Sequence, residues 1–273
     1  AISNGELVSQ IDNEDGNDTD ITTGTPSNPF KTIEYAQSRV LGTNQNPIII
    51  HVTGDHPAFE LVSDYVTVLF NGSTVLEYNN FDFIQILECI GCGISDIILN
   101  GATLLIENAK DVTLNNLEIR NTNHDSYGGL AIHRSNGITL KGNSVIKQNE
   151  RAGSIEYSKN VNILNSEISN NENGFDIIES EMVRFERVLF NNNNNTIWLN
   201  SFGALNESSN YSSLDIINST FVGDSNSCPT YSGGYKGYID ITTNSIINIT
   251  NSILWDSDNN CDELFIGRNW NAQ

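Results

Sequence analysis

Two carboxylates, Glu156 and Asp176, are the residues of this sequence best suited to catalysis, because they follow apolar residues in neighbouring segments of similar pattern. Paired carboxylates perform glycoside hydrolysis, with one held protonated by the charge of the other. If the segments are adjacent parallel strands about 4.8 Å apart, both side chains belong to one outward column with His133, Trp198 and Asp240. That spacing is nearer to the retaining than to the inverting carboxylate separation. The alternatives are a cation site and a solvated acidic face, since the chain has 34 Asp and Glu residues.

Basic residues form a second outward column, in a chain with only 13 Lys and Arg. Arg120 and Lys147 are expected on adjacent strands, with Arg151 in the following turn. A basic residue can remove the proton next to a uronate carboxylate whose charge a cation neutralises, which is the chemistry of a polysaccharide lyase. The simpler interpretation is that Arg120 or Lys147 pairs with Glu118 or Glu167 on the same face.

Aromatic residues indicate a third kind of site, for carbohydrate. Trp198 and the tyrosine-rich segment that contains Tyr231 and Tyr235 offer flat faces with polar rims, against which sugar rings pack. The same segment could instead cover the side of the protein, or dock onto another subunit.

Acidic residues dominate the charge, and the net charge is −21. Nucleic acid and anionic membranes are poor partners for such a chain, because both need clustered cations. Residues Asp15, Asp18 and Asp20 supply the oxygen ligands that calcium prefers, although their spacing is not that of an EF-hand. The sequence therefore predicts no cofactor other than calcium, with a solvated acidic loop as the alternative. It contains no apolar run long enough to insert into a membrane.

Cysteines and glycosylation sequons point to an oxidising, extracellular compartment. Cys228 and Cys261 fall at comparable places in neighbouring repeats and are expected to form a disulfide, whereas Cys89 and Cys92 form either a local disulfide or buried thiols. The chain begins at Ala1, as it would after removal of a signal peptide, so we expect secretion. The sequons expected to be accessible to glycosylation are Asn71, Asn194, Asn206, Asn210 and Asn248.

A repeated five-residue pattern must position all of these side chains: apolar, any, apolar, any, Asn. The pattern alternates as half-buried strands do, and its period predicts a solenoid of about ten parallel coils of roughly 20–26 residues each. We expect the Asn side chains to point inward at one corner and to hydrogen-bond to one another. On this hypothesis the Asn218 sequon is buried and carries no glycan. The Asn residues of this column are Asn116, Asn165, Asn218 and Asn251.

One segment departs from the strand pattern. Residues 29–41 have the apolar spacing of an amphipathic helix, with Pro29 suited to its first position and Gly42 to its end. Such a helix would cap the first coil, whose backbone edge is otherwise bare. We therefore divide the chain into an acidic loop and capping helix, 1–47, and a parallel β-helix, 48–273, with insertions at 200–213 and 223–237.

Two stretches resemble a known superfamily. Residues 15–18 followed by 24–36, and residues 249–255 with 262–265, resemble the first and last coils of secreted right-handed parallel β-helix proteins of the pectin-lyase-like superfamily. The resemblance implies that fold. It leaves the activity open, because the superfamily includes lyases, glycoside hydrolases, epimerases, phage tailspikes, adhesins and structural surface proteins. The polygalacturonase, pectate lyase and epimerase motifs are missing, and residues 121–125 are the nearest string to the first of them.

The sequence therefore favours a non-catalytic, glycosylated surface or structural β-helix. Because no capping helix is evident in the tail, residues 264–273, we expect the ends to stack head to tail with further copies, which would give filaments or adhesive layers. The alternative function is a polysaccharide lyase or glycoside hydrolase that acts on acidic polysaccharide. New ultraviolet absorbance from unsaturated uronate ends would distinguish a lyase from the structural protein.

Overall fold

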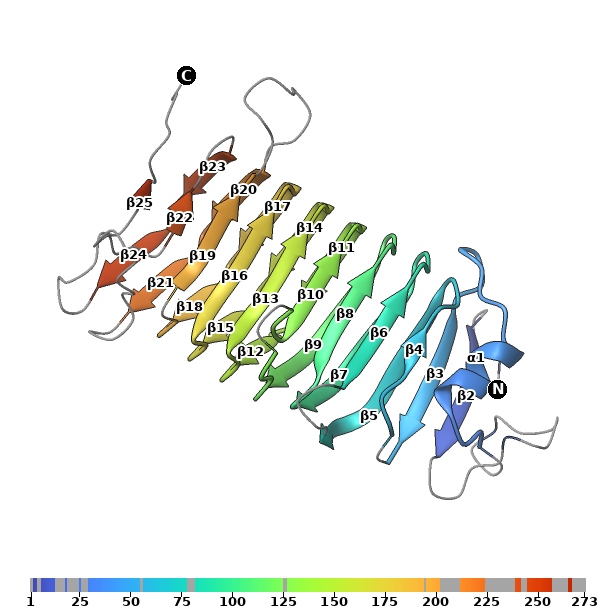
Figure 1. The fold of residues 1–273 in the computed structure, drawn as a ribbon. Helices are drawn as coiled ribbons and strands as arrows, with labels where there is room; N and C mark the ends of the chain where they lie inside the picture. The colour runs from blue at the N-terminus through green and yellow to red at the C-terminus, as the bar shows by residue number, and fades with distance from the viewer. Residues whose placement is uncertain are drawn as a thin grey trace.

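The chain winds into a parallel β-helix, seen side-on in Figure 1. This is a computed structural model, and the residues it describes are 2–3, 6–12, 18, 25, 29–54, 56–77, 82–124, 127–193, 195–201, 212–223, 239–241, 245–256 and 265–266. Within them, every strand pair is parallel except β1 with β2. The predicted all-β parallel fold is confirmed.

Two sheets run the length of the helix. The nine-stranded sheet contains β4 (Glu60–Leu61), β6 (Phe83–Leu87), β8 (Thr103–Glu107), β10 (Leu130–His133), β13 (Arg151–Glu156), β16 (Asn173–Ile178), β19 (Asn195–Asn200), β22 (Ile239–Ile241) and β25 (Phe265–Ile266). The main path of the larger sheet contains β1 (Ile2–Ser3), β2 (Glu6–Asp12), β3 (Ile48–Thr53), β5 (Val66–Glu77), β7 (Gly93–Asn100), β9 (Thr113–Arg120), β11 (Asn136–Lys141), β14 (Lys159–Leu164), β17 (Glu181–Glu186), β20 (Ser212–Ile217) and β23 (Ser245–Thr250).

A bend divides each later turn of the larger sheet into two strands. The second strands are β12 (Val145–Lys147), β15 (Glu167–Ser169), β18 (Leu189–Asn191), β21 (Thr220–Gly223) and β24 (Ile253–Asp256). Strands β7, β9, β11, β14, β17 and β20 begin six consecutive regular turns, fewer than the ten coils counted from sequence. Toward the N-terminus the register is less regular, because the pairing of β5 with β7 shifts between Leu69 and Thr74.

Alternate residues of every described turn point into a continuous apolar core. Aromatic side chains fill its C-terminal half, where Phe185 contacts Phe190 and the ring of Phe190 stacks on that of Phe221 at 4.3 Å. All three side chains are buried. The predicted alternation of apolar and polar residues therefore corresponds to a buried inner face. The stacking of successive turns shields this face from solvent.

The Asn residues of the repeated pattern lie at the bend of the larger sheet, but they do not point inward. Asn116, Asn165, Asn218 and Asn251 are exposed and have φ between 49° and 55°. The prediction of an inward column at these positions is wrong, and so is the burial of Asn218. Asn tolerates left-handed backbone better than most residues, and this conformation accounts for its recurrence.

In several turns a serine takes the inward position one residue after the corner residue, whereas after Asn116 the buried residue is Leu117. The hydroxyl of Ser144 accepts a hydrogen bond from the Leu117 N–H at 3.0 Å, and that of Ser219 accepts one from the Val188 N–H at 3.1 Å. Each hydroxyl thus satisfies a backbone donor of the preceding turn in the dry interior.

A buried Asn ladder does exist, at a different corner, between the larger sheet and the nine-stranded sheet. Asn149, Asn171 and Asn193 are each 2% exposed. The amide Nδ2 of Asn149 donates to Oδ1 of Asn171 at 3.0 Å, and Nδ2 of Asn171 donates to Oδ1 of Asn193 at 2.8 Å. The predicted interaction is thus present in a different set of asparagines.

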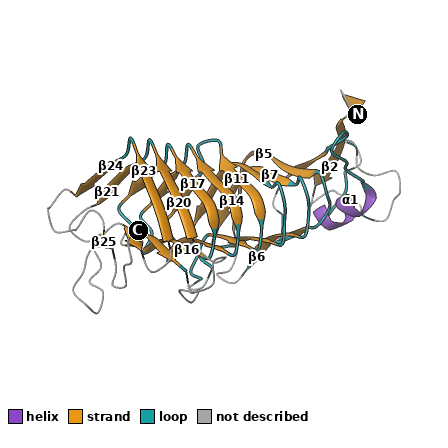
Figure 2. Ribbon diagram, turned by 90° about the horizontal axis from the view of Figure 1, so that it is seen from above, coloured by secondary structure: helices purple, strands orange, loops and turns teal. Residues whose placement is uncertain are grey.

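Helix α1 (Ile33–Arg39) covers the N-terminal end of the β-helix (Figure 2). It is shorter than the predicted 29–41, because the Thr32 side chain accepts the Tyr35 N–H at 3.2 Å and so fixes the start of the helix. Buried His56 accepts the Ile33 N–H at 3.1 Å. Among the described residues, no helix is both long and apolar enough to cross a bilayer.

Candidate functional site

The two candidate carboxylates lie on the outer face of the nine-stranded sheet, but not in one column. Asp176 of β16 pairs in register with Ser154 and Trp198, whereas Glu156 of β13 pairs with His133 and Ile178. The expectation that Glu156 and Asp176 face each other directly is therefore wrong. They are diagonal neighbours two residues out of register, which separates their Cα atoms by roughly 7–8 Å.

Asp176 is held by a cation. The guanidinium of Arg151 donates a hydrogen bond to its Oδ2. Burial raises the pKa of Asp176 above its ordinary value, the positive charge of Arg151 opposes this, and the negative charge of Glu156 adds to it. We expected Arg151 beside the basic column, but its guanidinium binds the carboxylate of Asp176 instead.

His133 joins Ser154 and Glu156 in a small polar cluster. Its Nε2 lies 3.1 Å from Ser154 Oγ and 3.8 Å from Glu156 Oε1. Burial lowers the pKa of His133, against the opposing charge of Glu156. In a Ser-His-acid triad the acid bonds the other ring nitrogen and the serine must be reachable. Here both partners share one nitrogen and Ser154 is fully buried, so the cluster does not form a nucleophile.

Aromatic rings cover this cluster from the side. Tyr127 packs on His133 with ring centroids 5.1 Å apart, and it also contacts His124 and Phe83. These contacts account for part of the burial that lowers the pKa of His133. These ring contacts could not be predicted from the periodic pattern, because His124 and Tyr127 lie outside the repeat.

The basic column is present as predicted. Lys147 of β12 pairs in register with Arg120 of β9. Both cations bind the same carboxylate, since Oε1 of Glu118 lies 2.9 Å from Arg120 Nη1 and 3.1 Å from Lys147 Nζ. The ion-pair interpretation is the one that the geometry supports, with Glu118 rather than Glu167 as the shared partner.

Of the three expected calcium ligands, the structure describes Asp18. Asp18 accepts hydrogen bonds from the Lys31 N–H at 2.7 Å and from the Thr32 hydroxyl at 2.7 Å. Its carboxylate therefore fixes the approach to helix α1. Asp15 and Asp20 lie outside the described residues. Among the residues that the structure describes, no group of three metal-ligating side chains is found.

Of the aromatic carbohydrate candidates, the structure describes Trp198. It is half-buried on β19 and lies next to Asp176 across the strand pair. Tyr231 and Tyr235 lie outside the described residues.

The sequons have different outcomes. Asn248 is exposed between Ile247 and Ile249, as expected, and its amide donates to Asp215 Oδ1 at 2.8 Å. Asn71 lies in β5, where only the backbone is described. Asn194, Asn206 and Asn210 lie outside the described residues.

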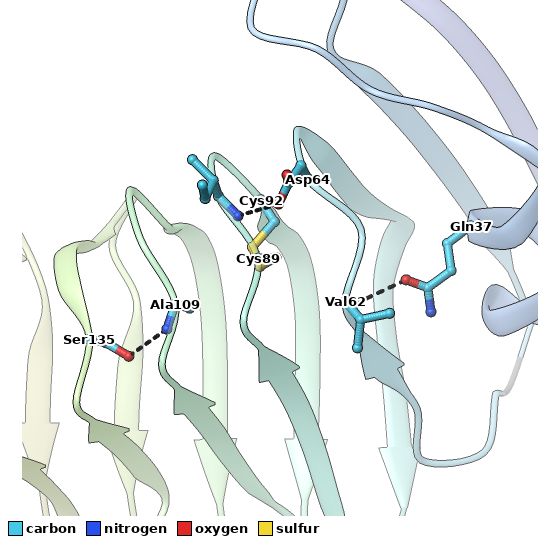
Figure 3. The surroundings of a disulfide bond; sticks show 8 residues. Gln37, Val62, Asp64, Cys89, Cys92, Ala109 and Ser135 are labelled. Carbon is cyan, nitrogen blue, oxygen red and sulfur yellow. Dashed lines mark hydrogen bonds between the residues drawn. A yellow bond between two sulfur atoms is a disulfide. The ribbon is translucent and has the colours of Figure 1, made fainter.

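A disulfide joins Cys89 and Cys92 at the corner after β6, as Figure 3 shows. This is the local pairing that the short spacing allowed. The other predicted bridge stays a prediction, because Cys228 and Cys261 lie outside the described residues.

Solved structures share this fold at low sequence identity. ORF18 of Geobacillus virus E2 aligns over 78% of this chain and 47% of its own, with a TM-score of 0.50 and 10% identity. An alginate lyase from Paenibacillus sp. str. FPU-7 covers 86% of this chain and 96% of its own, with a TM-score of 0.46 and 12% identity. PfbA, a surface adhesin of Streptococcus pneumoniae, covers 81% and 74%, with a TM-score of 0.36 and 12% identity.

These likenesses concern the fold alone. The parallel β-helix is the fold that the sequence resemblance implied. The solved structures include an alginate lyase and a surface adhesin, so they leave the function open. This chain spans about half the length of ORF18. No protein-family model and no curated protein matches the sequence.

Proposed function

We propose that this chain is a non-catalytic extracellular β-helix with a structural or adhesive role at a cell surface. The observation that carries the proposal is the pairing of the basic candidates: Arg120 and Lys147 share Glu118, and Arg151 binds Asp176. A lyase base must be able to accept a proton from the substrate. The cations here are instead paired with carboxylates of the chain itself, so they are poorly placed to act on a substrate.

The net charge of the whole chain also supports a non-catalytic role. With a net charge of −21, the surface repels polyuronates unless a cation bridges the two. The expected calcium ligand Asp18 is hydrogen-bonded to the chain itself. Acidic polysaccharide is therefore a poor substrate, whereas a neutral glycan could pack against Trp198.

Self-association end to end and glycosylation are part of the proposal. The last long turn exposes Ile246, Ile253 and Trp255 on its outer surface, with Trp255 61% exposed. Large exposed apolar side chains can mark contacts with a partner. At the other end helix α1 covers the first coils, so a further copy would meet the helix rather than bare strands. Asn248 is accessible to a glycan.

The test is a search for turnover, combined with a measurement of assembly. Alginate, pectin and chondroitin are each incubated with the protein, and new ultraviolet absorbance and new reducing ends are recorded. We expect neither. Turnover that is lost in Lys147→Ala, or in Asp176→Asn, would overturn the proposal. Light scattering over a concentration series should show growing species, and a monomer at every concentration would remove the assembly.

A glycoside hydrolase is the second candidate, favoured by one observation. Burial raises the pKa of Asp176 in the direction a general acid needs, and Trp198 flanks it. Release of new reducing ends, abolished by Asp176→Asn and by Glu156→Gln, would establish this function.

A further inference from the structure

A groove opens at the corner between the nine-stranded sheet and the larger sheet, near the N-terminal end. Its volume is about 760 Å³. It lies between the segment after α1, the turn after β4, and the corners that follow β6 and β8. The residues that line it include Leu41, Val62, Asp64, Glu88 and Glu107.

The wall formed by α1 and β4 is fixed in place. The Gln37 side chain donates to the Glu60 carbonyl at 2.5 Å and accepts the Val62 N–H at 3.1 Å, a contact drawn in Figure 3. Gly42 approaches the next turn closely, because a Cβ there would lie 2.5 Å from the Asp64 carbonyl oxygen. The groove is therefore formed before any ligand binds, which reduces the entropic cost of binding.

The wall on the next turn is equally constrained. The Cys89–Cys92 disulfide closes the corner after β6, and Asp64 Oδ1 accepts the Ile90 N–H at 2.8 Å (Figure 3). The Tyr65 N–H is bonded to the Ile90 carbonyl at 2.7 Å. With these backbone groups already paired, a ligand must be recognised by side chains rather than by addition of a strand.

Most of the side chains that line the groove are aliphatic or acidic. Leu41 is 87% exposed and Val62 is 50% exposed, with Val40 and Leu87 beside them. Three acids, Asp64, Glu88 and Glu107, accompany them, and no lining residue is basic. One of these charges is partly compensated, since Arg134 lies 3.2 Å from Glu107.

We propose that this groove binds a short segment of a partner protein in which an aliphatic side chain is flanked by Lys or Arg. The aliphatic residue covers Leu41 and Val62, and the cations face Glu88 and Asp64. The volume is within the range of about 300–1,000 Å³ typical of ligand pockets, so it suits a few residues rather than a folded domain. Polyanions are repelled by the acids, and sugar rings find no aromatic face among the lining residues.

The test uses a fluorescein-labelled peptide of sequence Lys-Leu-Lys-Val-Lys-Leu-Lys and fluorescence anisotropy at physiological ionic strength. Burial of one aliphatic side chain contributes about 10- to 100-fold in affinity. We therefore expect Leu41→Ser to weaken binding by at least about tenfold. Because Leu41 is mostly exposed, the variant should melt as the parent does.

Matched controls separate this groove from general attraction to an acidic protein. Met182 is exposed at a distant turn, so Met182→Ser should not change affinity. Glu88 and Glu179 occupy equivalent corner positions, with φ of 54° and 45°, and only Glu88→Gln should weaken binding. A peptide with serine in place of leucine and valine should bind poorly. The proposal is overturned by no binding to the parent, by equal losses in test and control variants, or by undiminished binding of the serine peptide.

Discussion

Replacing Asn171 by alanine tests how much the buried Asn ladder contributes to stability. The Asn171 side chain makes four hydrogen bonds: Oδ1 accepts from the N–H and from Nδ2 of Asn149, both at 3.0 Å, and Nδ2 donates to Asn193 at 2.8 Å and to the Ile146 carbonyl at 3.1 Å. Alanine at this position leaves the Asn149 N–H and the Ile146 carbonyl without the hydrogen bonds that the Asn171 side chain makes to them. Each buried polar group left unpaired costs about 1–3 kcal/mol. We therefore expect a loss of about 2–6 kcal/mol in the free energy of unfolding.

The measurement is urea unfolding followed by circular dichroism, with Asn170→Ala as the neighbouring control. Asn170 is exposed with φ of 55°, and its Oδ1 accepts from Asn192 at 2.8 Å. Alanine there meets a left-handed backbone at a cost of about 1–2 kcal/mol. If Asn171→Ala were no more destabilising than Asn170→Ala, the ladder would not be a main determinant of stability, and our reasoning would be refuted.

Two further outcomes concern the N-terminal cap and the register of the nine-stranded sheet. Burial lowers the pKa of His56, against the charges of Glu34 and Asp18, and its Nε2 accepts the Ile33 N–H only when unprotonated. The stability that neutral His56 contributes is therefore fully present above about pH 6.5 and is lost as the pH falls through the lower folded pKa. Urea unfolding between about pH 7.5 and 5 should show this loss of stability. In the His56→Phe variant the loss on acidification should be smaller. Gly153→Ala should destabilise by about 1–3 kcal/mol or more, because its Cβ would lie 2.1 Å from the Leu130 carbonyl oxygen. Thermal melting of the variant beside the parent measures this loss, and an unchanged melting temperature would refute the prediction.

The fold could be predicted from the sequence because the repeat carries the information locally. Alternating apolar residues defined the inward face, and the fixed offset of Asn located one corner. The direction of the Asn side chains could not be deduced from spacing alone. A residue with positive φ turns its side chain outward and leaves the inward position to the next residue, as Asn165 and Ser166 do.

The candidate site was predicted less well, and one glycine accounts for much of the error. Gly153 occupies an inward position opposite Phe175, but it has no side chain to reveal this in the sequence. Alignment by visible apolar residues therefore places Glu156 opposite Asp176, whereas the true partner of Asp176 is Ser154. The corner groove gave no signal, because its lining residues come from segments that are separated in sequence and outside the repeat's main pattern.

The regular spacing of the buried asparagines would allow the β-helix to gain or lose whole turns. Asn149, Asn171 and Asn193 follow one another at intervals of 22 residues, and their side chains hydrogen-bond to asparagines and backbone groups of the adjacent turns. Removing or duplicating one such interval leaves donors and acceptors matched across the new junction. Gain or loss of whole intervals is therefore a route by which descendants of this chain could become shorter or longer without redesign of the interior.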